Sequence, residues 1–297
     1  MTFLDQTNHT NFKTITADDE AFGSLFHGIF PPVDELYICS NNLEDLLARP
    51  RIAIVGTRQV TPYGKQVTRQ FAGELAGQGI VVVSGLAFGV DSVAHTAALD
   101  AGGLTIAVLP SSLSRVYPSA HTQLAKRIVE QGGALISEYP VGSDIAYKNQ
   151  FVERNRIVSG MSNALLITEA GASSGTIHTA NFAMDQGKEV MVVPGNITSP
   201  FSAGTNNLLR SPKAQPVITP DDVLHVLGLS PRNKKPPVRG KTVEEQAIIN
   251  LLARNVTNGQ DIFEKSCLGI AEYNQALTML ELTGRVMPLG NNHWALR

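Results

Sequence analysis

The run from Phe151 to Arg156 combines side chains that are suited to hold a nucleic-acid strand. Phe151 supplies an aromatic ring, Arg154 and Arg156 supply guanidinium groups, and Lys148 comes shortly before them. Aromatic rings stack on unpaired bases, and guanidinium groups bind phosphates through paired hydrogen bonds. On a helix, Phe151 and Arg154 share a face because they are three residues apart, whereas Arg154 and Arg156 point to different sides. The two arginines are therefore expected to have different roles.

Our hypothesis is that one of these arginines binds phosphate while the other pairs with a buried carboxylate. The candidate carboxylates are Asp91, Glu138 and Glu169. The alternative is that both arginines form structural ion pairs and that Phe151 belongs to the core. Asn155, between the two arginines, is assigned to the same nucleic-acid site.

Gly56, Thr57 and Arg58 follow the first predicted strand, residues 52–55. A dinucleotide-binding turn would need a second glycine at the position of Arg58, so that a pyrophosphate can approach the backbone. A P-loop is excluded too, since Gln66 stands where its magnesium-binding hydroxyl would be. Arg58 is therefore expected to present a cation at the edge of the sheet. The alternative is a surface arginine in a tight turn.

The chain alternates short apolar runs with helical segments, which predicts the α/β class. We expect an extended Rossmann-like parallel sheet with helices on both faces, because strands that are apolar throughout are buried on both sides. The runs that predict strands are residues 52–55, 80–83, 105–109, 134–136, 164–167 and 189–193.

Small and hydroxyl-bearing residues follow several of these strands. In open α/β sheets, ligands bind outside the carboxyl ends of the strands. Ser84 and Gly85 lie at one such end, and Ser174, Gly175 and Thr176 lie between a strand and a helix at another. Their backbone amides are expected to bind an anion. The alternative, weighed about equally for the second group, is a tight strand-to-helix connection.

The domain organisation follows from composition. Residues 1–50 read as a polar leader with a short extended lead-in, and residues 51–228 as the Rossmann-like domain that carries the candidate nucleic-acid site. Residues 229–240 form a basic linker rich in proline, and residues 241–297 are expected to form a winged-helix domain of three helices and a hairpin.

The winged-helix domain lacks the charge of a typical DNA reader. Residues 241–297 contain five Lys/Arg and six Asp/Glu, and the expected recognition helix, residues 270–282, carries Glu272 and Glu281 without Lys or Arg. Without cations that displace counterions, a helix has little tendency to enter a phosphate-lined groove. A protein-contact or spacer role is therefore favoured over a DNA-binding transcription factor.

Composition excludes several other classes. The net charge is −2, so any basic surface must be local, and Cys39 and Cys267 are too far apart for a metal or redox motif. The histidines have no second ligand at metal-binding spacing, and no nucleophile or acid–base pair is evident. No secretory signal or membrane-spanning run is evident. We expect a cytoplasmic protein that is not an enzyme, needs no cofactor or metal and does not bind membranes.

The motifs together resemble those of the DNA-processing protein A (DprA/Smf) family, from about residue 20 onward. The segments that carry the resemblance are residues 54–58, 84–91, 116–118, 154–158, 174–176, 193–195 and 204–206. The resemblance implies an extended Rossmann-like domain that binds single-stranded DNA, forms a homodimer and helps to load RecA onto incoming strands in natural transformation. The positions that match the family's DNA pocket are Arg58, Lys148, Phe151 and the run Arg154–Arg156.

The chain departs from the family pattern at a few places. Phe88 stands where the family usually has arginine, which removes one cation, and His121 stands where asparagine is common. The helical N-terminal domain of many members is expected to be missing, which affects any partner contact made by that domain. The C-terminal part resembles a winged-helix tail that some members carry.

An enzyme or sensor for a small nucleotide is the main rival function. LOG-type phosphoribohydrolases share this kind of sheet and cleave nucleotide monophosphates with a catalytic glutamate in a Pro-Gly-Gly-x-Gly-Thr-x-x-Glu motif. Here the matching stretch, residues 170–179, has no glutamate after Thr176. That difference favours strand binding over hydrolysis.

Overall fold

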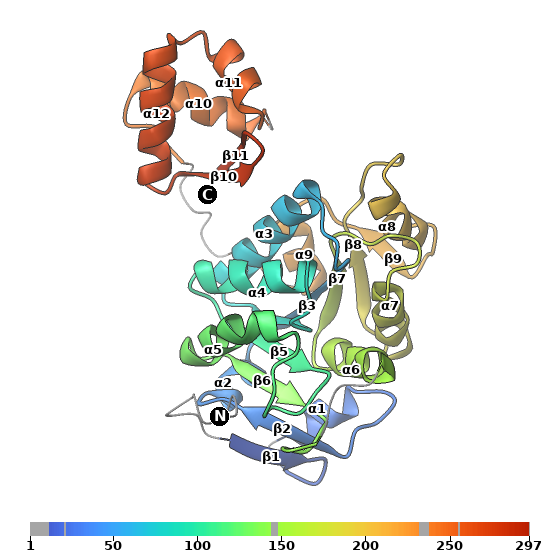
Figure 1. Ribbon diagram of the computed structural model, residues 1–297. Helices are drawn as coiled ribbons and strands as arrows, with labels where there is room; N and C mark the ends of the chain where they lie inside the picture. Colours follow the sequence, from blue (N-terminus) through green and yellow to red (C-terminus); the bar gives the residue numbers. More distant parts are fainter. Residues whose placement is uncertain (1–11, 21, 144–147, 232–237, 255, 297) are drawn as a thin grey trace. The chain divides into compact units, whose positions relative to one another are not determined.

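The computed structural model describes residues 12–20, 22–143, 148–231, 238–254 and 256–296 (Figure 1). The chain divides into two compact units, residues 1–232 and residues 233–297. Among the described residues, none of the helices is both long enough and apolar enough to cross a bilayer.

Within the described residues, the first unit contains a nine-stranded sheet with the order β1-β2-β6-β5-β4-β3-β7-β8-β9. The strands are β1 (Phe12–Thr16), β2 (Glu35–Cys39), β3 (Arg51–Val55), β4 (Val81–Ser84), β5 (Thr105–Leu109), β6 (Ala134–Ser137), β7 (Ala164–Ile167), β8 (Glu189–Val192) and β9 (Ala214–Pro216). Strands β3 to β9 pair in parallel, as expected for β3 to β8 from their apolar runs, whereas β9 was not predicted.

Helices cover both faces of this sheet. One face carries α3 (Pro62–Gly77), α4 (Val90–Asp100), α5 (Thr122–Glu130) and α9 (Pro220–Val226). The other carries α1 (Gly23–His27), α2 (Leu43–Ala48), α6 (Lys148–Gly160) and α7 (Thr176–Asp185), as Figure 1 shows for α6 and α7. Short helices η2 (Ser119–His121), η3 (Pro200–Ser202) and α8 (Ala203–Leu208) complete the connections.

The side chains of β3 point alternately into the hydrophobic clusters on the two faces of the sheet. Ile52 and Ile54 pack into the cluster that contains α3 and α4, while Ala53 and Val55 pack into the cluster that contains α6 and α7. Successive side chains of a strand point to opposite faces, so a strand that is apolar at every position is buried on both sides. The predicted α/β fold with helices on both faces is confirmed.

The sheet is mixed at one edge. Strand β2 pairs antiparallel with both β1 and β6, so the sheet includes residues that precede residue 51, where the Rossmann-like domain was expected to begin. The extended lead-in around Leu36 is strand β2, and its apolar residues join the same core as β3 and α6.

The direction of strand addition reverses next to β3. From β3 the chain adds β4, β5 and β6 on one side, and then β7, β8 and β9 on the other. The helices that follow β3 and β7, α3 and α7, therefore cover opposite faces of the sheet, and the carboxyl edge at this point is the usual ligand position in open α/β sheets. Helix α6 runs between β6 and β7, so it begins near this same edge.

The second unit has the predicted winged-helix elements. Within its described residues it contains α10 (Val243–Ala253), α11 (Gly259–Ser266), α12 (Ile270–Leu282) and the antiparallel hairpin β10 (Val286–Gly290) and β11 (His293–Leu296). Ile248, Ile262 and Leu280, one from each helix, are fully buried in its own core. The three helices and the hairpin agree with the sequence expectation.

Candidate nucleic-acid interface

Arg58 presents an exposed guanidinium at the carboxyl edge of the sheet. Its terminal carbon lies 5.2 Å from the centroid of the Phe151 ring, which α6 brings to this edge. Among the described residues, no carboxylate lies within ion-pair distance of Arg58. An aromatic face attracts a cation without neutralising it, so Arg58 keeps its charge available for a ligand.

The turn that carries Arg58 is held by hydrogen bonds to the backbone and the side chain of Glu169. The Thr57 amide donates to the carbonyl of Glu169 at 2.7 Å, which joins the loops after β3 and β7. The buried Glu169 carboxylate accepts hydrogen bonds from the amide and hydroxyl of Thr61, at 2.8 and 2.6 Å, and Thr61 caps α3. A Cβ at Gly56 would overlap Val90. Gly56 and Thr57 therefore position Arg58, and Glu169 is not a partner of either arginine on α6.

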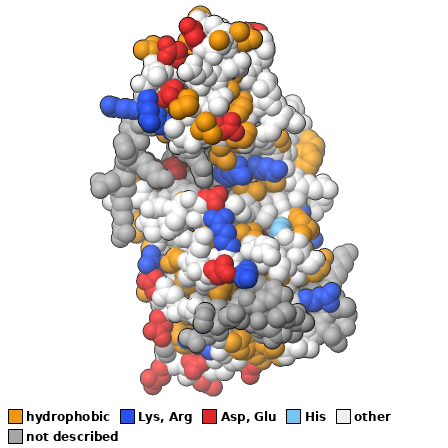
Figure 2. Space-filling view, turned by 60° about the vertical axis from the view of Figure 1, so that its left-hand side comes forward, with side chains coloured by type: hydrophobic (Ala, Val, Ile, Leu, Met, Phe, Trp, Pro, Cys, Tyr) orange, Lys and Arg blue, Asp and Glu red, His pale blue; other side chains and the backbone are white. Residues whose placement is uncertain are grey.

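The loops at this edge have a local charge that differs from that of the whole chain. In the loops that follow β3, β4, β5, β7 and β8, all of which are described, Arg58 and Arg115 are exposed while the sole carboxylate, Glu169, is buried, and the carboxylate directly after β6, Glu138, is paired with Arg156. On the side of the molecule seen in Figure 2, by contrast, cationic and acidic side chains are interspersed. A local excess of positive charge favours a polyanionic ligand.

Aromatic side chains flank Arg58 and Phe151. The Tyr117 ring meets Phe151 edge-on, with centroids 5.2 Å apart, and remains 47% exposed. The Phe88 ring packs edge-on against His121 at 4.8 Å and remains 49% exposed. Half-exposed rings beside unpaired cations are the arrangement by which proteins bind unpaired nucleotides.

Arg154 is a buried structural residue in this conformation. It is 4% exposed, and one of its terminal nitrogens donates to the carbonyls of Gly85 and Val108. Burial lowers the pKa of Arg154 to about 10, which the nearby Asp91 opposes. Burial also raises the pKa of the Asp91 carboxyl, while Arg154 and the amides of Ala87 and Gly85 oppose that rise. This geometry does not offer Arg154 to a phosphate.

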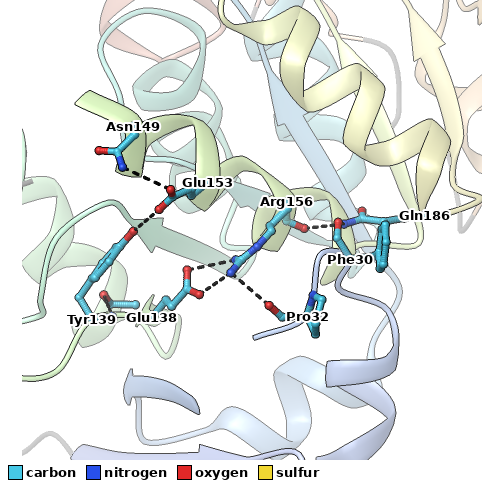
Figure 3. A network of polar contacts seen from close by, with 9 residues as sticks. Phe30, Pro32, Glu138, Tyr139, Asn149, Glu153, Arg156 and Gln186 are labelled. Carbon is cyan, nitrogen blue, oxygen red and sulfur yellow. Dashed lines mark hydrogen bonds and ion pairs between the residues drawn. The ribbon is translucent and has the colours of Figure 1, made fainter. Parts of the chain in front are cut away.

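Arg156 is the arginine that pairs with a carboxylate. Both terminal nitrogens bond to Glu138, one of the three carboxylates considered from the sequence, and one of them also donates to the Pro32 carbonyl at 3.3 Å (Figure 3). Gln186 donates to the carbonyls of Arg156 and Phe30, both at 2.9 Å. Arg156 therefore ties α6 to the strand β6 and to the segment before β2.

In this structure neither of the two arginines offers a free guanidinium to a phosphate. Both are buried, as the structural alternative required, yet only Arg156 forms an ion pair at contact distance. Phe151 is partly exposed and faces Arg58, so it is not a core residue as that alternative assumed.

The expected amide donors divide into two groups. The Gly85 amide donates to the Asp91 carboxylate at 3.1 Å and the Ser84 hydroxyl donates to the Ile54 carbonyl at 2.7 Å, so both are engaged. In this structure neither group is free to bind an anion. The Gly175 amide is exposed and has no hydrogen-bond partner among the described residues.

The remaining predicted residues lie as follows. The hydroxyls of Ser174 and Thr176 bond to each other at 2.9 Å beside Gly175, at the start of α7. The side-chain Oδ1 of Asn155 accepts a hydrogen bond from Nε of Arg154 at 3.3 Å. Helix α6 begins at Lys148, whose side chain lies outside the described part of the structure.

The sequence analysis did not select Arg115 or Tyr117 as site residues, and it considered Asp91 only as a candidate partner of an arginine. Tyr117 lies in a quoted motif, and the lack of acidic residues around Arg115 was readable from the strand-end loops. Asp91 gave no such signal, because its role depends on the fold of the loop above it.

The chain matches known families over most of its length. Residues 13–228 match the family model for DNA recombination-mediator protein A, and residues 231–292 match that of the DprA winged helix domain. Protein Smf of Escherichia coli is 35% identical over 257 residues, which cover 83% of this chain and 68% of that protein.

Two further comparisons bear on the site. The putative DNA processing protein DprA of Mycobacterium tuberculosis is 42% identical over 184 residues, which cover 62% of this chain and 46% of that protein. The DNA processing protein A of Helicobacter pylori, solved in work on its single-stranded DNA binding mode, superposes with a TM-score of 0.65 at 33% identity, over 76% of this chain and 98% of that one. The chain thus spans about half to two thirds of the first two relatives.

Proposed function

Because this chain belongs to the DNA recombination-mediator protein A family, we propose that it binds single-stranded DNA at the carboxyl edge of its large sheet. The observation that carries this proposal is the exposed Arg58 guanidinium, which rests on the Phe151 ring and has no carboxylate partner among the described residues. A cation beside a ring suits a strand in which phosphates alternate with unpaired bases. The single-stranded DNA binding of the Helicobacter pylori relative supports the same ligand class.

Each part of the interface has a distinct role in this proposal. Arg58 and Lys148 neutralise phosphates, and Phe151 stacks on a base. The Gly175 amide and the Ser174 hydroxyl donate hydrogen bonds to the sugar–phosphate backbone. Arg154 and Arg156 act indirectly, because they hold the loops and the helix that carry the contacting groups.

We further propose a role for the complex of this protein with single-stranded DNA. The protein would protect incoming single strands and promote their loading with RecA during natural transformation and recombination, as a homodimer in the cytoplasm. A sequence-tolerant contact through phosphates and stacked bases suits this task, since incoming strands have no common sequence.

The winged-helix unit is assigned a protein-contact or spacer role. Its helix α12 exposes uncharged residues, including Asn274, Gln275 and Thr278, along the side opposite its buried core. The negative charges of Glu272 and Glu281 on the same helix oppose entry into a DNA groove.

The test compares single-stranded and duplex oligonucleotides of the same sequence, bound to the full chain at two salt concentrations and followed by fluorescence anisotropy. We expect tighter binding of the single strand, loss of affinity as salt rises, and no competition by free AMP. Preference for the duplex, or release of adenine from AMP, would contradict the proposal and favour a DNA reader or a nucleotide-cleaving enzyme respectively.

A further inference from the structure

The loop after β4, residues 85–89, has a backbone that buried side chains hold at several points. The Gly85 carbonyl accepts from Arg154, and the Asp91 carboxylate accepts from the amides of Gly85 and Ala87 at 3.1 and 3.3 Å. The Leu86 carbonyl accepts a hydrogen bond from Nδ1 of His121 at 2.7 Å. Four backbone groups of three consecutive residues are thus fixed by side chains from α4, α6 and η2.

This loop also contains a residue in an unfavourable conformation. Leu86 has a φ of 56°, which side chains with a Cβ rarely adopt, and its own side chain is fully buried. Such conformations persist where the surrounding structure over-determines them, and they concentrate at ligand-binding segments. The group that this rigid loop presents to solvent is the ring of Phe88.

Phe88 lies next to the backbone of Arg58. The following residue, Gly89, approaches the carbonyls of Thr57 and Arg58 so closely that a Cβ there would overlap them. The Val90 amide donates to the Thr57 carbonyl at 3.1 Å, which fixes the two loops against each other. The ring is 49% exposed, and the loops around it contain no exposed carboxylate among the described residues.

We propose that Phe88 is a second base-stacking residue, which binds a nucleotide next to the one held by Arg58 and Phe151. This inference rests on the proposed single-strand function. An uncharged ring stacks on any base and releases no counterions, so its contribution to affinity is independent of salt. The edge-on His121 ring supports Phe88 from one side and leaves the ring partly open to a base.

The test uses Phe88→Leu, which keeps an apolar side chain of similar length but removes the flat ring. We expect about tenfold weaker binding of an oligothymidylate, an unchanged slope of log affinity against log salt, and recovery with Phe88→Trp. The decisive comparison repeats the measurement on a strand with abasic sites, where wild type and Phe88→Leu should bind equally.

Each other outcome is informative. Equal affinities of wild type and Phe88→Leu for the thymidylate strand would overturn this inference while leaving the proposed function intact. An equal loss on the abasic strand would overturn it too, since the ring would then act on the backbone or on the loop. Failure of the wild type to bind any single strand would instead refute the proposed function itself. Urea unfolding of both variants checks that the fold is retained.

Discussion

The guanidinium of Arg58 lies over the ring of Phe151, 5.2 Å from its centroid, although Arg58 follows β3 and Phe151 lies on α6, which connects β6 to β7. This contact orients a cation without pairing it with an acid. Because an aromatic ring is not a counter-ion, the charge of Arg58 remains effective toward a phosphate. The first two predictions separate the cation from the ring.

Arg58→Ala is expected to weaken single-strand binding and to reduce its salt dependence. Loss of one phosphate contact should lower the slope of log affinity against log salt by about 0.7, the value for single strands. Arg127→Ala is the matched control, since Arg127 is an exposed arginine on α5 that is already paired with Asp100 at 2.7 Å. Equal slopes for wild type and Arg58→Ala would argue against a phosphate contact.

Phe151→Leu is expected to weaken binding by about 1–3 kcal/mol, the range found for base–aromatic stacking. The salt slope should change little, because no charge is removed. Val152→Ala, an exposed residue on the same helix, is the control and should bind like wild type. Anisotropy titrations at several salt concentrations measure both quantities. If the salt slope falls instead of staying unchanged, the ring acts by orienting Arg58 and not by stacking on a base.

Arg154→Met is expected to destabilise the fold by about 3–5 kcal/mol, because it leaves the buried Asp91 carboxylate uncompensated and the Gly85 carbonyl without its donor. Addition of Asp91→Asn should restore part of this stability. Urea unfolding provides the measurement. A variant as stable as wild type, with a lowered salt slope, would instead return Arg154 to the group of phosphate-binding residues.

A chain that ends at residue 232 is expected to bind single strands with nearly the affinity and salt slope of the full chain. The first unit has its own core and carries every proposed contact, whereas the winged-helix unit has a separate core. Parallel titrations of the two chains test this expectation. A large loss of affinity on truncation would assign a direct binding role to the winged-helix unit.

The buried His95 makes the fold sensitive to acid. Burial, with Arg154 and His121 nearby, lowers the pKa of His95 from 6.5 to about 3, so the folded state keeps the ring neutral while the unfolded chain takes up a proton. Its stabilising contribution is therefore complete above about pH 6.5 and is lost progressively toward pH 3. At pH 5 the loss is about 2 kcal/mol.

His95→Gln removes this titration and isolates the effect. The free energy of unfolding of wild type should fall more steeply than that of His95→Gln between pH 7 and pH 5, as measured by urea unfolding at each pH. Parallel pH dependences would show that another group controls the acid sensitivity.

The sequence by itself determined the parallel core of the α/β sheet, the elements of the C-terminal unit and the position of Arg58. Strands that are apolar at every position, the order of strands and helices, and the three helices with a hairpin at the C-terminus all reflect local patterns of hydrophobicity and turn residues. Arg58 was accessible to the same reasoning, because a residue directly after a parallel strand must lie at the carboxyl edge of the sheet.

Only the tertiary structure decided which cations and amides remain free. Arg154 is held by the carbonyls of Gly85, which follows β4, and of Val108 in β5, and Arg156 is held by Glu138, which follows β6, and by Pro32 before β2. The Gly85 amide is likewise engaged by Asp91. Whether a polar group faces solvent or a buried partner depends on segments that meet only in the folded chain, and helical spacing alone carries no information about them.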